Sequence, residues 1–199
     1  MFHVFPRAVP KKECERLLDY CIKNTNFSEA SVLNKGEYGV DSDNFGRVDP
    51  RIRKTDIAFI TPDDKADNRV NEIAWHFLTL ANEIKFNYKF NIFQPVQFAR
   101  YRDGGHYGWH QDINESGISP GGESRKLSLT FSLSDPKTYE GGHLEFYRGE
   151  RPMEDRVIED IRDQGSVVVF DSRDYHRVTP VIKGTRYSIV CWTVGPNFV

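Results

Sequence analysis

The pattern of apolar and polar positions changes after Asn91. Beyond this residue, short runs rich in Val, Ile, Phe, Tyr and Thr alternate with Gly, Pro, Asp and Ser. β-Branched and aromatic residues favour strands, and regularly spaced short strands are typical of a β-sandwich or jelly roll. The predicted strands are residues 95–101, 106–111, 126–134, 143–147, 166–170, 174–178 and 185–194, with an eighth candidate at 156–162.

The part of the chain before Asn91 contains two stretches with helical spacing. Pro10 suits the first turn of a helix, and apolar residues then recur at helical spacing through about Lys23. A stronger stripe runs from Val70 to Ile84, after a turn and helix cap at residues 62–64. Short strands are predicted at residues 2–5, 26–33 and 55–60.

We therefore expect a mainly β protein with flanking helices, an α+β fold. Its 199 residues suffice for one good core. The prediction is a single domain of residues 1–199, with helical support over about 1–92 and a jelly-roll core over about 93–195.

Charge and cysteine content narrow the class of protein. The 27 basic and 29 acidic residues are well mixed and give a net charge of −2, which argues against a nucleic-acid or membrane-surface partner. The first residues lack a signal-peptide pattern, and no apolar run is long enough to span a membrane. Cys14, Cys21 and Cys191 have no CxxC spacing, which favours a reducing, cytoplasmic location.

Residues 34–50 are rich in Gly, Asp and Asn and are predicted to form a long irregular loop. Such loops are often lids or binding loops, and are otherwise disordered. Arg47, Arg51 and Arg53 lie in or beside it, and in an extended segment Arg51 and Arg53 would face one way. Arg47 and Arg53 are candidates for substrate binding, and a solvated charged edge is the alternative.

A candidate metal site begins at His110-x-Asp112. At a strand end, residues two apart point to the same face, so one ion could contact both side chains. His176 follows an apolar run at residues 167–170 and a turn, on a strand that can pair beside the one leading to His110. Two imidazoles and one carboxylate leave three octahedral positions open, which suits non-haem Fe(II) and not a closed structural zinc site. Taken alone, however, His110 is more often a half-buried polar residue than a ligand.

Arg186 stands near the start of the apolar strand predicted at residues 185–194. A buried guanidinium needs a partner, and the carboxylate of a dicarboxylate cosubstrate offers bidentate hydrogen bonds. A salt bridge with a carboxylate of the protein is the alternative.

These residues belong to an ordered set of motifs that resembles the 2-oxoglutarate- and Fe(II)-dependent oxygenases, and most of all their prolyl 4-hydroxylase-type group. The similarity covers about residues 95–195. The set consists of Tyr101-x-x-x-Gly105-x-Tyr107-x-x-His110-x-Asp112, Gly141-Gly142-x-Leu144-x-Phe146, His176 and Arg186-x-Ser188.

The resemblance implies a double-stranded β-helix, which is a jelly-roll barrel, and a role for each matching residue. His110, Asp112 and His176 would bind Fe(II), and Arg186 would bind the distal carboxylate of 2-oxoglutarate. Tyr101 matches a tyrosine that lines the cosubstrate pocket, and Thr130 would add a hydroxyl contact. Trp109 is a candidate wall on the substrate side, with ordinary packing as the alternative. Collagen-type enzymes often carry Lys where Arg186 stands, so the resemblance does not fix the subgroup.

The resemblance also implies a dioxygenase that consumes O2 and 2-oxoglutarate, releases succinate and CO2, and hydroxylates a C–H bond. Some relatives also use ascorbate to re-reduce iron. A prolyl or other residue of a protein or peptide is the first expectation for the substrate, and a small molecule or free amino acid is the alternative. Nucleic-acid demethylases typically carry a second arginine six residues after the first, where this chain has Trp192. A jelly-roll binding module with a vestigial metal site is the non-enzymatic alternative.

Overall fold

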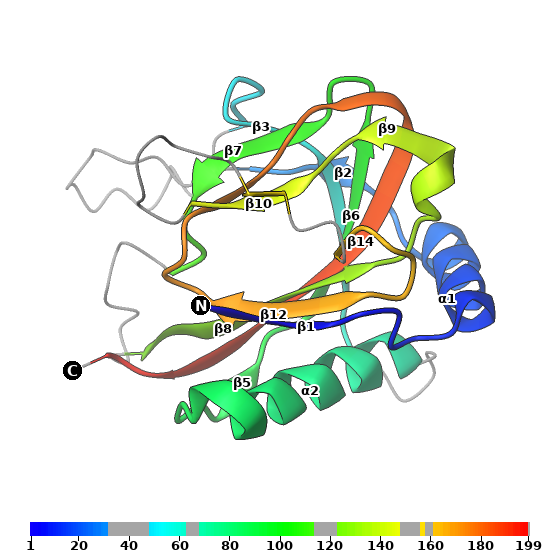
Figure 1. The fold of residues 1–199 in the computed structure, drawn as a ribbon. Coiled ribbons are helices and arrows are strands. Elements are labelled where there is room, and N and C mark those ends of the chain that lie inside the picture. The colour runs from blue at the N-terminus through cyan, green and yellow to red at the C-terminus, as the bar shows by residue number, and fades with distance from the viewer. Residues whose placement is uncertain (32–47, 63–67, 114–122, 148–155, 158–160, 199) are drawn as a thin grey trace.

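The computed structural model describes residues 1–31, 48–62, 68–113, 123–147, 156–157 and 161–198. Two antiparallel sheets face each other, and the helices lie outside them (Figure 1). The larger sheet has the order β1 (Phe2–Phe5), β12 (Val167–Asp171), β8 (Glu123–Ser132), β14 (Val181–Pro196), β6 (Val96–Arg102), β4 (Asp56–Ile60) and β2 (Ser28–Glu29), and both β5 (Ile92–Phe93) and β9 (Tyr139–Gly141) pair with β14.

The smaller sheet completes the jelly roll that the strand pattern predicts. Its order is β11 (Arg156–Val157), β10 (Leu144–Phe146), β13 (His176–Val178), β7 (His106–His110) and β3 (Arg53–Lys54). The prediction of a mainly β, jelly-roll fold is thus confirmed.

Alternation along β8 divides its side chains between two cores. Leu129 and Phe131 belong to an apolar cluster that also contains residues of both helices. Val168 belongs to a second cluster, inside the barrel, and pairs in register with Thr130. Because residues paired across neighbouring strands point to the same face, Thr130 and Ser132 face the barrel interior. This face carries the candidate site.

The helices cover the outer face of the larger sheet (Figure 1). Helix α1 (Lys11–Asn24) starts directly after Pro10, as predicted. Helix α2 (Arg69–Ala81) begins after Asn68, so the cap predicted at residues 62–64 is wrong; residues 63–67 lie outside the described part.

The predicted stripe of α2 is correct through Ala81 and wrong at Ile84, whose side chain is 56% exposed. Ile84 lies in a π-helical turn, η1 (Asn82–Phe86). A π turn has more residues than an α turn, which rotates the following side chains away from the core. A 3-10 turn, η2 (Pro136–Thr138), precedes β9.

The predicted strands all overlap observed ones, but the pattern does not predict β3, β5 and β9. These have two or three residues each, too few to show a period of two. The strand predicted at residues 26–33 is reduced to Ser28–Glu29 within the described residues, and most of the loop predicted at 34–50 lies outside them. Within the described residues, none of the helices combines the length and the apolar character that a membrane span requires.

Strands β7 and β13 lie side by side in the smaller sheet and carry the two candidate histidine ligands. His176 pairs with His110 and Val178 pairs with Tyr107, so the register shifts between the two pairs. The shift lets Tyr107 and His110, three residues apart, both reach the barrel interior.

Candidate metal centre and adjoining pocket

The barrel interior has a cationic end that is built around Arg186 of β14. Arg186 is only 3% exposed and pairs in register with Tyr101 of β6. Its guanidinium carbon lies 5.2 Å from the centroid of the Tyr101 ring, and it donates a hydrogen bond to Ser188 Oγ at 3.3 Å. Among the described residues no carboxylate pairs with Arg186. The alternative prediction of a salt bridge within the protein therefore finds no support there.

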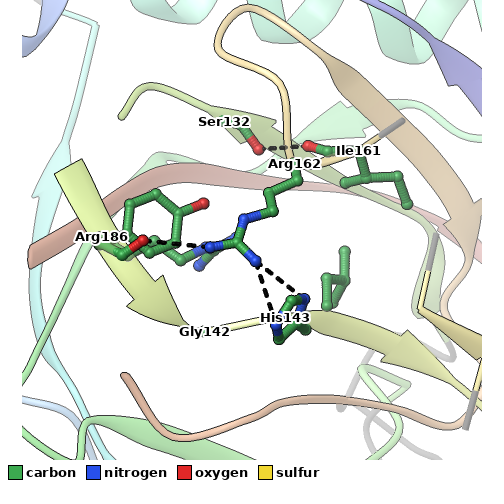
Figure 2. A pocket seen from close by; sticks show the side chains of 8 residues that line it. Ser132, Gly142, His143, Ile161, Arg162 and Arg186 are labelled. Carbon is green, nitrogen blue, oxygen red and sulfur yellow. Dashed lines mark hydrogen bonds between the residues drawn. The ribbon is translucent and has the colours of Figure 1, made fainter. Parts of the chain in front are cut away.

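A small pocket, partly open to solvent, adjoins Arg186 (Figure 2). Ser132 of β8 lines it, as do residues between Tyr139 and Leu144 and the pair Ile161 and Arg162. Thr130 is 6% exposed and shares the interior face with Ser132, but no direct contact joins it to Arg186. The structure thus brings Tyr101 to Arg186, while the contact predicted for Thr130 stays a prediction.

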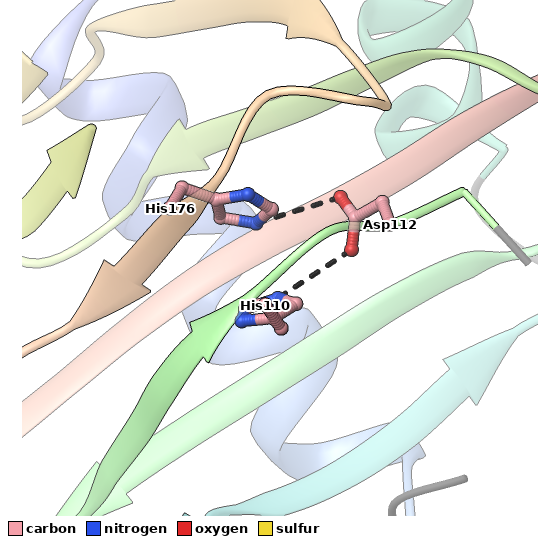
Figure 3. A group of neighbouring side chains, drawn as sticks. All are labelled: His110, Asp112 and His176. Carbon is pink, nitrogen blue, oxygen red and sulfur yellow. Dashed lines mark ion pairs between the residues drawn. The ribbon is translucent and has the colours of Figure 1, made fainter. Parts of the chain in front are cut away.

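His110, Asp112 and His176 form a compact group at the ends of β7 and β13 (Figure 3). One potential ligand atom from each lies within 4.8 Å of the others. Nε2 of His110 is 3.6 Å from Asp112 Oδ1, and Nε2 of His176 is 3.6 Å from Asp112 Oδ2. These separations exceed a good hydrogen bond. They leave the three groups converging on a common point, as ligands of one ion do.

Both imidazoles are oriented by backbone carbonyl groups. Nδ1 of His110 lies 2.8 Å from the carbonyl oxygen of Gly108, and Nδ1 of His176 lies 3.0 Å from that of Asp174. A carbonyl oxygen only accepts, so Nδ1 of each ring carries the proton. Nε2 of each ring then keeps a lone pair that points toward Asp112. Metal-binding histidines are fixed in the same way.

The ionisation states of the group also suit a cation. Burial, and to a lesser extent the proximity of His110, lower the pKa of His176 to about 4, so the His176 ring is neutral at neutral pH. Burial by itself would raise the pKa of Asp112, but His176, His110 and Arg125 outweigh it and hold that pKa well below its usual range. Neutral imidazole and ionised carboxylate are the forms that bind metals.

Aromatic rings pack against the imidazoles and shield them from water. The Tyr107 ring stacks on His110 with centroids 3.4 Å apart. Phe170 and Phe146 lie against His176 with centroids 4.7 and 5.9 Å away. Such walls hold the rings in place and lower the local dielectric constant. The donor set, two imidazoles and a carboxylate with positions left open, therefore fits a mononuclear Fe(II) site.

A second group of polar side chains adjoins the ligands. Arg125 donates to the carbonyl oxygen of Asp112 at 3.3 Å, and its guanidinium lies 3.9 Å from the centroid of the Trp192 ring. The guanidinium of Arg53 lies 4.4 Å from the centroid of the Tyr107 ring. Nε of Arg53 and Nε1 of Trp192 are buried without a hydrogen-bond partner among the described residues. We refer to Arg53, Arg125 and Trp192 as the donor cluster.

Arg51, predicted to lie on the same side as Arg53, is not part of the donor cluster. Arg51 is in a turn, 82% exposed and paired with Asp49 at 2.7 Å, whereas Arg53 is 8% exposed. The prediction that Arg51 and Arg53 face one way is wrong. Arg51 lies in a turn, and the extended strand β3 begins only at Arg53. Arg47 lies outside the described residues.

Trp109 packs against Arg177, whose guanidinium is 4.7 Å from its ring centroid, and against Tyr147 at 6.3 Å. Arg177 in turn pairs with Glu145. These contacts agree with the alternative that Trp109 is an ordinary packing residue. Its role as a substrate wall stays a prediction.

Residues 96–194 match the family model described as the 2OG-Fe(II) oxygenase superfamily. The chain belongs to this superfamily. The matched segment contains the three candidate ligands and Arg186, which are the residues that carry the resemblance in the sequence.

Curated relatives of this oxygenase are named PKHD-type hydroxylases. The one from Pseudoalteromonas atlantica is 34% identical over 104 residues, which are 51% of this chain and 44% of the relative. The one from Acidovorax ebreus is 37% identical over 101 residues, 49% of this chain and 42% of the relative. The match thus spans less than half the length of these relatives.

Solved structures share the fold of the oxygenase over nearly its whole length. A prolyl 4-hydroxylase from Pseudomonas putida has a TM-score of 0.69 at 22% identity, covering 96% of this chain and 91% of the other. A prolyl hydroxylase from Trichoplax adhaerens, in complex with a peptide fragment of hypoxia inducible factor, has a TM-score of 0.70 at 20% identity, covering 96% and 82%.

Two arginines near the oxygenase site were not predicted from the sequence. Arg125 directly precedes the strand predicted at residues 126–134, and Arg162 ends the eighth candidate strand. Neither has a sequence neighbour that points to the site. Arg125 is brought there by β8, and Arg162 by a turn that is hydrogen-bonded to β8 through Ser132 and Ile161.

Proposed function

We propose that the protein is an Fe(II)- and 2-oxoglutarate-dependent dioxygenase that hydroxylates a C–H bond of its substrate. The observation that carries the proposal is the coexistence, in one barrel interior, of the His110, Asp112 and His176 group and the buried, carboxylate-free Arg186. A ligand that binds a metal through one end and a guanidinium through the other is a dicarboxylate such as 2-oxoglutarate. Family membership supports the same reading.

Bound iron would activate O2, and the residues of the chain would hold the ion, orient the cosubstrate and exclude water. His110, Asp112 and His176 would hold the ion, with both rings fixed by the carbonyl groups that accept from Nδ1. Arg186 would orient the cosubstrate along the barrel. Phe146 and Phe170 would keep water from the reacting centre. Succinate and CO2 are the expected products.

A peptide or protein residue, prolyl in the first instance, is the substrate that we propose. The donor cluster supports it, since Arg53 Nε and Trp192 Nε1 are buried donors for which the described part of the chain offers no acceptor. Leaving such groups unpaired costs about 1–3 kcal/mol each, and the carbonyl oxygens of a peptide would satisfy them. The Trichoplax adhaerens enzyme of the same fold was solved with a peptide. Arg47 and Trp109 stay candidates for further contacts.

A free amino acid or small carboxylic acid is the second candidate substrate. Arg53 and Arg125 both carry positive charge beside Tyr107, and each acts on the pKa of that residue. Two guanidiniums so close to the ligands also suit a substrate carboxylate. Nucleic-acid demethylation has less support, because Trp192 stands where a second arginine would be expected.

The proposal is tested first at the metal. Anaerobic titration of the protein with Fe(II) and 2-oxoglutarate should produce a weak charge-transfer band in the visible range. His110→Ala should abolish the band, and an unchanged spectrum in the unsubstituted protein would refute the proposal.

The substrate is tested next. A peptide library and a set of free amino acids are incubated separately with Fe(II), 2-oxoglutarate and O2, with and without ascorbate. Mass spectrometry should detect addition of one oxygen to peptides. Addition only to free amino acids would favour the second candidate.

A further inference from the structure

A second guanidinium shares the pocket of Arg186. Arg162 lines it from the segment before β12, and Arg186 lines it from β14 (Figure 2). The other described residues that line the pocket are all without a carboxylate: Ser132, Tyr139, Gly142, His143, Leu144 and Ile161. The pocket is therefore cationic.

Arg162 contacts no carboxylate in the described part of the chain. Its Nη1 is 3.3 and 3.2 Å from the two ring nitrogens of His143, and its Nη2 donates to the carbonyl oxygen of Tyr139 at 3.2 Å. One nitrogen placed evenly between both nitrogens of a ring cannot align well with either, so the contact with His143 is weak. Two guanidiniums in one pocket repel each other and lose hydration, and a bound anion relieves both costs.

The segment that carries Arg162 is fixed relative to the pocket. Ser132 Oγ donates to the carbonyl oxygen of Ile161 at 2.8 Å, which ties the segment to β8. The guanidinium of Arg162 lies 5.0 Å from the centroid of the Tyr139 ring. A cation that is already held near its binding position loses less conformational entropy when the ligand arrives.

Gly142 keeps this end of the pocket open beside Arg186. A Cβ there would come within 3.0 Å of Arg186 Cδ, and the residue has φ +62°, which favours glycine. A side chain at position 142 would therefore occupy the space beside the two guanidiniums and exclude a ligand from it.

We infer that Arg162 is a specificity-determining residue of the cosubstrate pocket, which together with Arg186 binds the distal carboxylate of a 2-oxo dicarboxylic acid. The inference rests on the proposed function. Two guanidiniums can donate to different oxygens of one carboxylate, so the pocket distinguishes a charged chain end from an apolar one.

Calorimetry on the Mn(II)-loaded protein tests the inference without turnover. The ligands are 2-oxoglutarate and 2-oxopentanoate, which has the same carbon chain but lacks the distal carboxylate. Arg162→Gln should weaken 2-oxoglutarate binding about tenfold or more and leave 2-oxopentanoate binding unchanged. Arg162→Lys should recover part of the loss. Lys137→Gln removes an exposed positive charge outside the pocket and should bind both ligands like the unsubstituted protein.

The outcomes separate the inference from the proposed function. If the unsubstituted protein fails to bind 2-oxoglutarate, the proposed function is wrong. If it binds, and Arg162→Gln binds within twofold of it or weakens both ligands equally, Arg162 is only a structural clamp. Should Arg162→Gln fail to fold, Arg162→Lys decides, since it keeps the charge but loses the planar fork and should still weaken 2-oxoglutarate selectively.

Discussion

Asp112 holds the two imidazoles of the candidate site together through its two carboxylate oxygens, each 3.6 Å from one Nε2. Asp112→Asn keeps the shape of this side chain but removes the charge that balances a bound cation. We expect Mn(II) affinity to fall by more than the roughly 10- to 100-fold that is typical when a residue hydrogen-bonded to a metal ligand is replaced. Calorimetry measures the change.

Asp49→Asn is the matched control, because Asp49 is also a buried carboxylate but pairs with Arg51. It should leave Mn(II) affinity unchanged. Retention of affinity within threefold in Asp112→Asn would contradict the assignment of the ligand.

Two buried indoles allow the donor cluster to be tested in the same way. Nε1 of both Trp192 and Trp75 is buried and finds no hydrogen-bond partner within the described ranges, but Trp192 adjoins Arg125 while Trp75 packs against Phe93. Trp192→Phe should raise the KM for the prime substrate about tenfold, with the KM for 2-oxoglutarate unchanged, because a donor to the substrate is lost. Trp75→Phe should alter neither constant. Equal effects of the two substitutions in steady-state kinetics would exclude Trp192 from substrate binding.

Among the elements, the connection that leads into β12 depends on Gly165. This residue has φ +87°, and a Cβ there would lie 2.0 Å from the carbonyl oxygen of Val9. Gly165→Ala should lower the free energy of unfolding by more than about 2 kcal/mol, since backbone strain and the clash add. Urea denaturation measures it. Gly108→Ala, where the nearest atom is 3.4 Å away, should change it by less than about 1 kcal/mol, and a similar loss in both variants would refute the explanation.

The elements also show which features a sequence can predict. Strand β12 was predictable because its continuous run of β-branched and aromatic residues is typical of a strand that is buried on both faces. The α2 stripe was predictable because burial of one helix face imposes a period of 3.6 on the residues. The group of His110, Asp112 and His176 was predictable because this combination of side chains is rare. The register shift between β7 and β13 was not, since it arises from pairing between strands far apart in the chain. The same applies to Arg125 and Arg162.

Across the whole molecule, the thiols report on global unfolding. Cys14, Cys21 and Cys191 are 0% exposed and lie in the core between helices and sheet. Burial raises the pKa of Cys14 and of Cys191 to about 12, so hardly any thiolate forms at pH 8 in the folded state. In the unfolded chain the pKa returns to about 8.5 and the thiols react. Labelling by a thiol reagent at pH 8 should therefore follow the rate or equilibrium of unfolding. Rapid labelling of the folded protein would contradict this.

Strand β14 is a single uninterrupted strand of the larger sheet, and it carries both Arg186 and Trp192. Register with Tyr101 and with Ser128 directs the two side chains to the same interior face. Six residues at about 3.3 Å each set roughly 20 Å between Arg186 and Trp192. The length of β14 between these two residues therefore sets the distance between their side chains. Inserting or deleting one residue between Arg186 and Trp192 would turn one of the two side chains outward. The spacing between the two inward-facing side chains can therefore change only in steps of two residues.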